Sequence, residues 1–189
     1  MGALTIFLGL IVVTALILYP MYVSLIRKKN KVKEAFSSIN VQLKKRYDLI
    51  PNILTIANKF MEHERGLMEE VAKLRTEVLS IPDSDLGKKL ELDGQLKSKM
   101  QQLLVSVENY PQLKSDATMV TAMQTYNEVE EHIAAARRFF NTAVNELNNA
   151  VEIFPSSLIA GLLGIKAQEY FNIEEAETKP INAGDYFNK

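Results

Sequence analysis

The stretch ALTIFLGLIVVTALILYPMYVSLI, residues 3–26, decides how the rest of this sequence is interpreted. It contains no charged residue, and the first charge after it is Arg27. A helix needs roughly 20 mostly apolar residues to cross the hydrocarbon core of a bilayer, so this stretch is long enough to span one. It is apolar on all sides, whereas a surface helix of a globular domain has one apolar stripe. We therefore predict a transmembrane anchor over residues 1–27.

The flanks of this stretch predict its fate and its orientation. A cleaved signal peptide has a basic start and a shorter apolar core that ends in small residues, but here no base precedes the apolar run and bulky residues end it. An uncleaved anchor is therefore favoured. Loops rich in Lys and Arg stay in the cytoplasm. Since five bases follow the stretch closely, we expect a single-pass protein in the cell membrane, with its N-terminus outside and most of the chain cytoplasmic.

Composition excludes several kinds of site. The chain of 189 residues has no cysteine, which rules out disulfides, a thiolate nucleophile and cysteine-bound metals. Residues 1–46 carry eight Lys/Arg and one acidic residue, whereas residues 47–189 carry 14 basic and 22 acidic residues. The basic block thus adjoins the predicted anchor, and the rest of the chain is acidic. An acidic domain without a basic–aromatic pattern argues against nucleic-acid binding.

Apolar residues recur at helical spacing in four stretches after the anchor. The first continues from the anchor to a break expected at Asp48 and Pro51, where Asp48 would cap the next helix. The others are predicted over residues 51–79, 85–109 and 119–151, with Ser115 or Asp116 as a start cap and Phe154-Pro155 as an end. Short connections make neighbouring helices antiparallel. The predicted fold is all-α: an N-terminal transmembrane helix, then an antiparallel four-helix bundle over residues 28–178, with a flexible tail over 179–189.

Catalytic and metal-binding chemistry finds little support in the sequence. Di-iron sites in helical bundles need a Glu three residues before each His. The two histidines, His63 and His132, follow Phe60 and Val129 at that spacing. No phosphate-binding glycine loop or nucleophile motif occurs. We therefore expect no metal, no cofactor and no catalytic residue, and predict that the protein is not an enzyme.

Two sets of residues are candidates for other roles. Asparagine is a poor helix former, so the asparagines and arginines of the fourth helix suggest a buried polar network, with solvent exposure as an equally good alternative. The candidates for that network are Asp48, Asn52, Arg138 and Asn141. The apolar run LIAGLLGI, residues 158–165, either caps the bundle, which we favour, or dips into the membrane surface. The candidate membrane-surface contacts are Arg27, Lys28, Lys29, Lys31, Lys33, Leu158, Ile159, Leu162 and Leu163.

Several motifs resemble the LemA family, in the family's order and over nearly the whole chain. They are NKVKEAFSSINVQLKKRYDLIPN at 30–52, EHE at 62–64, ENYPQLK at 108–114, IAAARRFFN at 133–141, FPS at 154–156, Gly164 and YF at 170–171. Phe36 stands where the family often has Trp, and the Lys44-Lys45-Arg46 run is less Arg-rich. The resemblance implies a membrane-anchored helical bundle and supplies no catalytic residue.

These observations together favour a non-catalytic protein-interaction or scaffold module at the membrane. The alternatives are a lipid-binding or membrane-remodelling module and a regulatory subunit of a membrane enzyme. The expected partners are the lipid bilayer and an unidentified protein, and homo-oligomerisation stays open.

Overall fold

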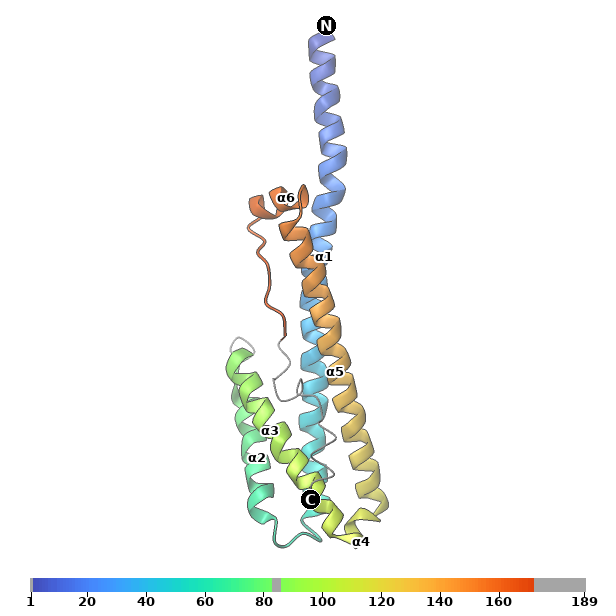
Figure 1. The fold of residues 1–189 in the computed structure, drawn as a ribbon, viewed down its shortest axis with the longest axis vertical. Coiled ribbons are helices and arrows are strands. Elements are labelled where there is room, and N and C mark those ends of the chain that lie inside the picture. Colours follow the sequence, from blue (N-terminus) through green and yellow to red (C-terminus); the bar gives the residue numbers. More distant parts are fainter. Residues whose placement is uncertain (1, 83–85, 172–189) are drawn as a thin grey trace, which may run out of the picture. The chain divides into compact units, whose positions relative to one another are not determined.

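The computed structural model describes residues 2–82 and 86–171, and its regular elements are all helical, which confirms the predicted all-α class. The elements are α1 (Gly2–Ala57), α2 (Arg65–Ser80), α3 (Leu86–Ser106), the short 3-10 helix η1 (Val107–Asn109), α4 (Pro111–Lys114), α5 (Ala117–Glu152) and α6 (Ser156–Leu162) (Figure 1). The predicted tail over 179–189 lies outside the described residues.

The chain divides into two compact units, which are described separately below. The terminal unit combines residues 1–37 with 136–189, and the central unit is the intervening stretch, 38–135. The long helices α1 and α5 each contribute residues to both units. The chain connectivity therefore gives the central unit four main helical segments: the end of α1, then α2, α3 and the start of α5.

The predicted break at Pro51 is wrong, because α1 continues through this proline to Ala57. A proline inside a helix has no N–H to donate to the carbonyl four residues earlier, here that of Tyr47. In the structure Arg75 of α2 supplies the missing donor, since its Nε lies 2.7 Å from the Tyr47 carbonyl oxygen. The second helix consequently begins at Arg65 rather than at Pro51. Asp48, the predicted cap, lies inside α1.

The role of Arg75 as the replacement hydrogen-bond donor gives a testable prediction. Arg75→Met will leave the Tyr47 carbonyl without its donor, and we expect it to lower the free energy of unfolding by about 1–3 kcal/mol. In the Arg75→Met/Pro51→Ala variant, the new alanine N–H will restore the helical hydrogen bond and recover most of the loss. Thermal unfolding followed by circular dichroism measures both effects. If Pro51→Ala raised stability equally with and without Arg75, the compensation would be disproved.

The later helix boundaries agree with the sequence. The predicted helix over 85–109 corresponds to α3 together with η1. Asp116 caps α5 as expected, because its Oδ1 accepts hydrogen bonds from the backbone N–H groups of Thr118 and Met119 at 2.9 and 3.0 Å. Helix α5 ends at Glu152, just before Phe154-Pro155. Fully buried side chains of the central unit include Ile39, Leu43, Ile50, Ile53, Met61, Val71, Leu96, Met100, Leu103 and Leu113.

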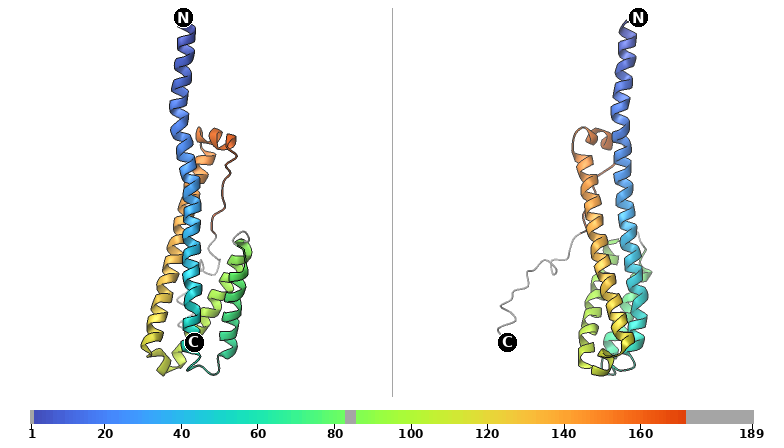
Figure 2. Two further views of the ribbon diagram at one scale, coloured as in Figure 1. Left: turned by 180° about the vertical axis from the view of Figure 1, so that it is seen from behind. Right: turned by 90° about the vertical axis from the view of Figure 1, so that its right-hand side faces the viewer.

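In the terminal unit, α1 packs against the end of α5 and against α6. Leu25, Val32 and Ala35 of α1 form a core with Ala143, Val144 and Leu147 of α5, and with Ile159, Ala160 and Ile165 in and after α6. Both views of Figure 2 show the N-terminal part of α1 extending past α6. Among the described helices α1 is the one that is long and apolar enough to cross a membrane, and its most apolar 18-residue window has no buried residue.

Candidate functional site

A buried ion cluster joins three helices of the central unit. Arg46 of α1 is 0% exposed and forms ion pairs with Asp93 of α3 and Glu130 of α5. Its Nη1 donates to Glu130 Oε1 at 2.7 Å, and its Nη2 donates to Asp93 Oδ1. The Tyr47 hydroxyl also donates to Asp93 Oδ1, at 2.7 Å. The two carboxylates thus share one guanidinium, a geometry suited to the fork of donors that arginine presents.

The electrostatics of this cluster raise the pKa values of its arginine and of two nearby tyrosines. Burial opposes the charge on Arg46, but the carboxylates of Asp93 and Glu130 outweigh it, so the pKa of Arg46 is raised. Burial, followed by the Asp93 charge, raises the pKa of Tyr47, and burial also raises the pKa of Tyr126. A general acid or base works best with a pKa near the operating pH. These shifts move the pKa values of all three groups further from neutral pH, so the groups suit a structural role.

Two of the motifs quoted above meet in the central unit. The hydroxyl of Tyr110, from the motif at 108–114, donates a hydrogen bond to Glu64 Oε2, from the motif at 62–64. This bond to the carboxylate raises the pKa of Tyr110. The contact joins the residue that precedes α2 to the residue that connects η1 and α4.

A row of asparagines on α5 binds the extended segment after α6, residues 165–171. Asn148 Nδ2 donates to the Gln168 carbonyl at 2.9 Å, and the Gln168 N–H donates to Asn148 Oδ1 at 2.8 Å. Asn141 makes the same reciprocal pair with the carbonyl and N–H of Phe171, at 3.0 and 2.8 Å. Between them, the Tyr170 hydroxyl donates to Asn145 Oδ1 at 3.2 Å. We call Asn141, Asn145 and Asn148 the asparagine row.

The spacing of the asparagine row matches that of the extended backbone. Asn141 and Asn148 are seven positions apart on a helix, which corresponds to about 10.5 Å at 1.5 Å per residue. Gln168 and Phe171 are three positions apart in extended chain, which corresponds to about 10 Å. Each asparagine amide therefore pairs with the backbone as a neighbouring strand would. This match explains why poor helix formers are placed at these two positions.

Aromatic packing fixes one end of this arrangement. The Phe171 ring lies edge-on to Phe140, with 6.5 Å between ring centroids, and the Arg137 guanidinium stands 4.7 Å from the Phe171 centroid. Phe140 also contacts Phe36 of α1, with the ring centroids 6.1 Å apart. A cation over an aromatic face is attracted by the ring quadrupole. The segment is thus held by backbone pairing and by one aromatic side chain.

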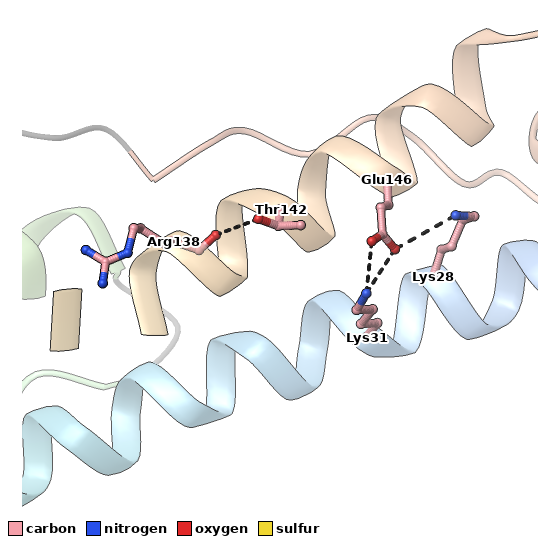
Figure 3. Close-up of polar contacts among 5 residues, drawn as sticks. All are labelled: Lys28, Lys31, Arg138, Thr142 and Glu146. Atoms are coloured by element: carbon pink, nitrogen blue, oxygen red, sulfur yellow. Dashed lines mark hydrogen bonds and ion pairs between the residues drawn. The ribbon is translucent and has the colours of Figure 1, made fainter. Parts of the chain in front are cut away.

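A third polar contact links α1 to α5 within the terminal unit. Figure 3 shows Lys31 and Lys28 of α1 reaching Glu146 of α5. Lys31 Nζ donates to both carboxylate oxygens at 3.0 Å, and Lys28 Nζ lies 3.9 Å from Oε2. The hydrogen bond from Lys31 holds the pKa of Glu146 below its usual range. Two of the predicted membrane-surface lysines therefore have a partner inside the protein.

The lowered pKa of Glu146 predicts a pH dependence. A carboxyl whose pKa is lower in the folded than in the unfolded state stabilises the fold above its unfolded pKa, and this contribution is lost as pH falls through the folded pKa. Glu146→Gln should therefore be less stable than the original chain at pH 7. The difference should shrink to zero in acid below the usual glutamate range near 4.3. Unfolding midpoints of both chains from pH 7 to 3 measure this; a gap that widened on acidification would contradict it.

The predicted polar network is corrected by these contacts. Asp48 is exposed and pairs with Lys44 at 2.7 Å, and Asn52 is exposed. The side chain of Arg138 is also exposed, and its carbonyl accepts from Thr142 (Figure 3). Asn141 is the member with an inward role, and its partner is the Phe171 backbone. The pattern identified the unusual asparagines, but it could not show that they face an extended segment instead of other side chains.

The predicted membrane-surface contacts divide into three groups by their exposure. Ile159 is buried in the core of the terminal unit, which corrects its place in that set. Lys28 and Lys31 are half-buried beside Glu146. The remaining members are exposed: Arg27, Lys29, Lys33, Leu158, Leu162 and Leu163.

The described surface of the central unit also has an open groove of about 650 Å³ between α1 and α5. It is lined by Leu49, Asn52, Thr55, Ile56, Ala117, Thr118, Thr121 and Ala122. None of these side chains titrates near neutral pH. Within residues 2–82 and 86–171, no three His, Cys, Asp or Glu side chains are grouped so that they could hold a metal ion. The lining therefore offers small, apolar and neutral polar side chains.

The fold and these contacts define an all-α protein with one N-terminal helix apolar enough to cross a membrane, and with polar clusters that hold its own elements together. The chain belongs to the LemA family, whose family model matches residues 35–183. This agrees with the resemblance carried by the sequence motifs.

The chain is also similar to curated proteins over different lengths. Protein LemA of Metamycoplasma hominis is 23% identical over 186 residues, covering 96% of this chain and 84% of that protein. Magnetosome protein MamQ of Magnetospirillum gryphiswaldense is 31% identical over 108 residues, covering 57% of this chain and 40% of that protein. Magnetosome protein MamQ 1 of Paramagnetospirillum magneticum is 30% identical over 100 residues, covering 53% of this chain and 37% of that protein. The match thus spans less than half the length of the MamQ proteins.

Proposed function

We propose that this chain is a membrane-anchored, non-catalytic protein-interaction module, and that a helix of a partner protein docks in the groove between α1 and α5. The observation that carries this proposal is the groove itself, which is open, about 650 Å³ in volume and free of titratable side chains. An amphipathic helix laid in a groove is a recurrent mode of protein recognition.

The side chains along the groove support a helix as its occupant. On α5, Ala117 and Thr121 are four residues apart, and so are Thr118 and Ala122, so each pair shares a helix face. Small residues at this spacing let two helix backbones approach closely. Thr55 and Asn52 of α1 add polar groups along the opposite wall. The partner helix would place small and apolar side chains against this surface.

The buried ion cluster supports a non-catalytic role. Arg46, Asp93 and Glu130 bind one another, and the Tyr47 hydroxyl is engaged with Asp93. Their contacts join helices, and the raised pKa values of Arg46 and Tyr47 keep both groups protonated. The function would therefore depend on surface binding and on position in the cell.

The anchor sets that position. Residues 3–26 of α1 would cross the cell membrane, with the exposed bases Arg27, Lys29 and Lys33 on the cytoplasmic side. Protease treatment of intact cells tests this orientation. Protection of the chain until the cells are lysed is expected, and digestion in intact cells would reverse the proposed topology.

Site-directed photo-cross-linking in intact cells tests the groove. A photoreactive phenylalanine analogue at Thr121, in the full chain, should give one discrete adduct with a different protein. The adduct should be lost when Thr118→Arg blocks the groove. The matched control position is Gln124, also exposed on α5 but not part of the groove lining. Equal adducts at Thr121 and Gln124, or adducts only with a second copy of this chain, would overturn the proposal.

A further inference from the structure

A second surface, distinct from the groove, lies at the end of the terminal unit. Phe154 is 74% exposed, Leu158 62% and Leu162 88%. These residues are spaced four apart, and Leu158 and Leu162 share one face of α6. Ile153 and Leu163 beside them are exposed as well. Contiguous exposed apolar side chains mark an interaction surface, whereas scattered ones do not.

The opposite face of α6 is fixed to the protein. Ile159 and Ala160 are buried in one core with Leu25 of α1 and Leu147 of α5, and Met21 and Ile26 pack against the same core. Helix α6 therefore both caps the terminal unit, as favoured from the sequence, and presents an apolar face outward. Through its buried face α6 packs beside Met21, Leu25 and Ile26 of α1, at the end of the apolar stretch.

The length of the anchor sets the depth of this face. Residues 3–26 in a helix span about 36 Å, whereas the hydrocarbon core of a bilayer is about 30 Å thick. If the hydrocarbon begins near residue 3, it ends near residue 22 or 23, at the level of α6. Tyr19 and Tyr22 are exposed there, as aromatic residues at membrane interfaces commonly are. The exposed bases Arg27 and Lys29 follow immediately.

We infer that α6 is an interfacial foot: Phe154, Leu158 and Leu162 insert into the boundary between headgroups and acyl chains of the same bilayer that α1 crosses. The occupant of this surface is lipid, because α6 itself packs against the end of the apolar anchor. The exposed bases Arg27 and Lys29, which follow the anchor, attract anionic headgroups to the same level. The inference rests on the proposed anchor. It adds a second contact that would fix the rotation and tilt of the terminal unit against the membrane.

Tryptophan fluorescence tests the foot cleanly, because the chain contains no tryptophan. Three single-tryptophan variants of the full chain, Leu162→Trp, Val13→Trp and Val105→Trp, are reconstituted in phosphatidylcholine–phosphatidylglycerol vesicles with and without brominated acyl chains. Val13 lies in the anchor, and Val105 is 70% exposed on α3 of the central unit. We expect blue-shifted emission and at least two-fold quenching by bromolipid for Leu162→Trp and Val13→Trp, and neither effect for Val105→Trp.

The outcomes separate the foot from the anchor and from self-association. Quenching of Val13→Trp without quenching of Leu162→Trp would overturn the foot and leave the anchor standing. Absence of quenching at both positions would overturn both. Blue-shifted but unquenched emission from Leu162→Trp would mean that protein, such as a second copy of this chain, covers α6, and the lipid inference would fail.

Discussion

Arg46→Met will unfold the central unit or bring it close to unfolding. Removing one partner of a buried ion pair leaves an uncompensated charge in the interior, which costs about 3–5 kcal/mol. Here two carboxylates, Asp93 and Glu130, lose their shared guanidinium at once. Since a whole protein is stable by only about 5–15 kcal/mol, the change removes much of that margin. Thermal unfolding of the full chain in detergent micelles, followed by circular dichroism, measures the loss.

Two further variants separate the charge from the packing. Lys45→Met, at the exposed neighbouring position, should leave the unfolding midpoint nearly unchanged. Arg46→Met/Asp93→Leu replaces the buried pair with apolar side chains and should recover a large part of the stability, because an apolar isostere of a buried pair is often neutral or better. Glu130 is 23% exposed and can reach water, so the double replacement need not include it. If the stability loss of the double variant equalled the sum of the losses of the two single variants, Arg46 and Asp93 would not be coupled.

The position of Arg46 shows what the sequence could and could not reveal. In the sequence Arg46 ends a run of three consecutive bases, Lys44-Lys45-Arg46, which is typical of a solvated surface. It nevertheless lies three residues after Leu43 and four before Ile50, and so on the apolar face of its helix. Asp93 is likewise three residues before Leu96. Helical spacing could therefore have nominated both as buried, but only tertiary packing of α1, α3 and α5 shows that they meet.

The prolines also show where sequence rules for helix boundaries fail. Pro111 and Pro155 lie at helix boundaries, as local rules predict. Pro51 does not, because Arg75, distant in sequence, satisfies the carbonyl that the proline leaves without a donor. A rule based on neighbouring residues cannot anticipate a donor from another helix. Long amphipathic helices were therefore predictable in kind and number, and the boundary at Pro51 was not.

The asparagine row could be recognised in the sequence, but the groups that it binds could not. The density of asparagines in α5 was unusual enough to demand a reason, since each has a cost in a helix. Their partners are backbone groups of Gln168 and Phe171, which every sequence possesses and which carry no pattern of their own. Sequence reasoning could therefore identify one side of this site and not the other.

Asn141→Ala/Asn148→Ala should release the extended segment from α5. The pair of changes removes four hydrogen bonds, each with a net contribution of roughly 0.5–1.5 kcal/mol, so the expected loss is about 2–6 kcal/mol for holding this segment. Hydrogen exchange at the Gln168 and Phe171 amides measures it directly, because both N–H groups donate to asparagine oxygens. Their exchange should become faster by at least ten-fold.

Asn149→Ala is the matched control, because Asn149 is exposed on the same helix and lies outside the asparagine row. It removes an asparagine of equal helix propensity without touching the segment, so exchange at Gln168 and Phe171 should stay slow. If the double variant exchanged no faster than this control, the contact of Phe171 with Phe140 and Arg137 would be sufficient to hold the segment. Faster exchange at both amides, with the unfolding midpoint of the central unit unchanged, would locate the effect in the terminal unit and assign the asparagines of α5 their structural role.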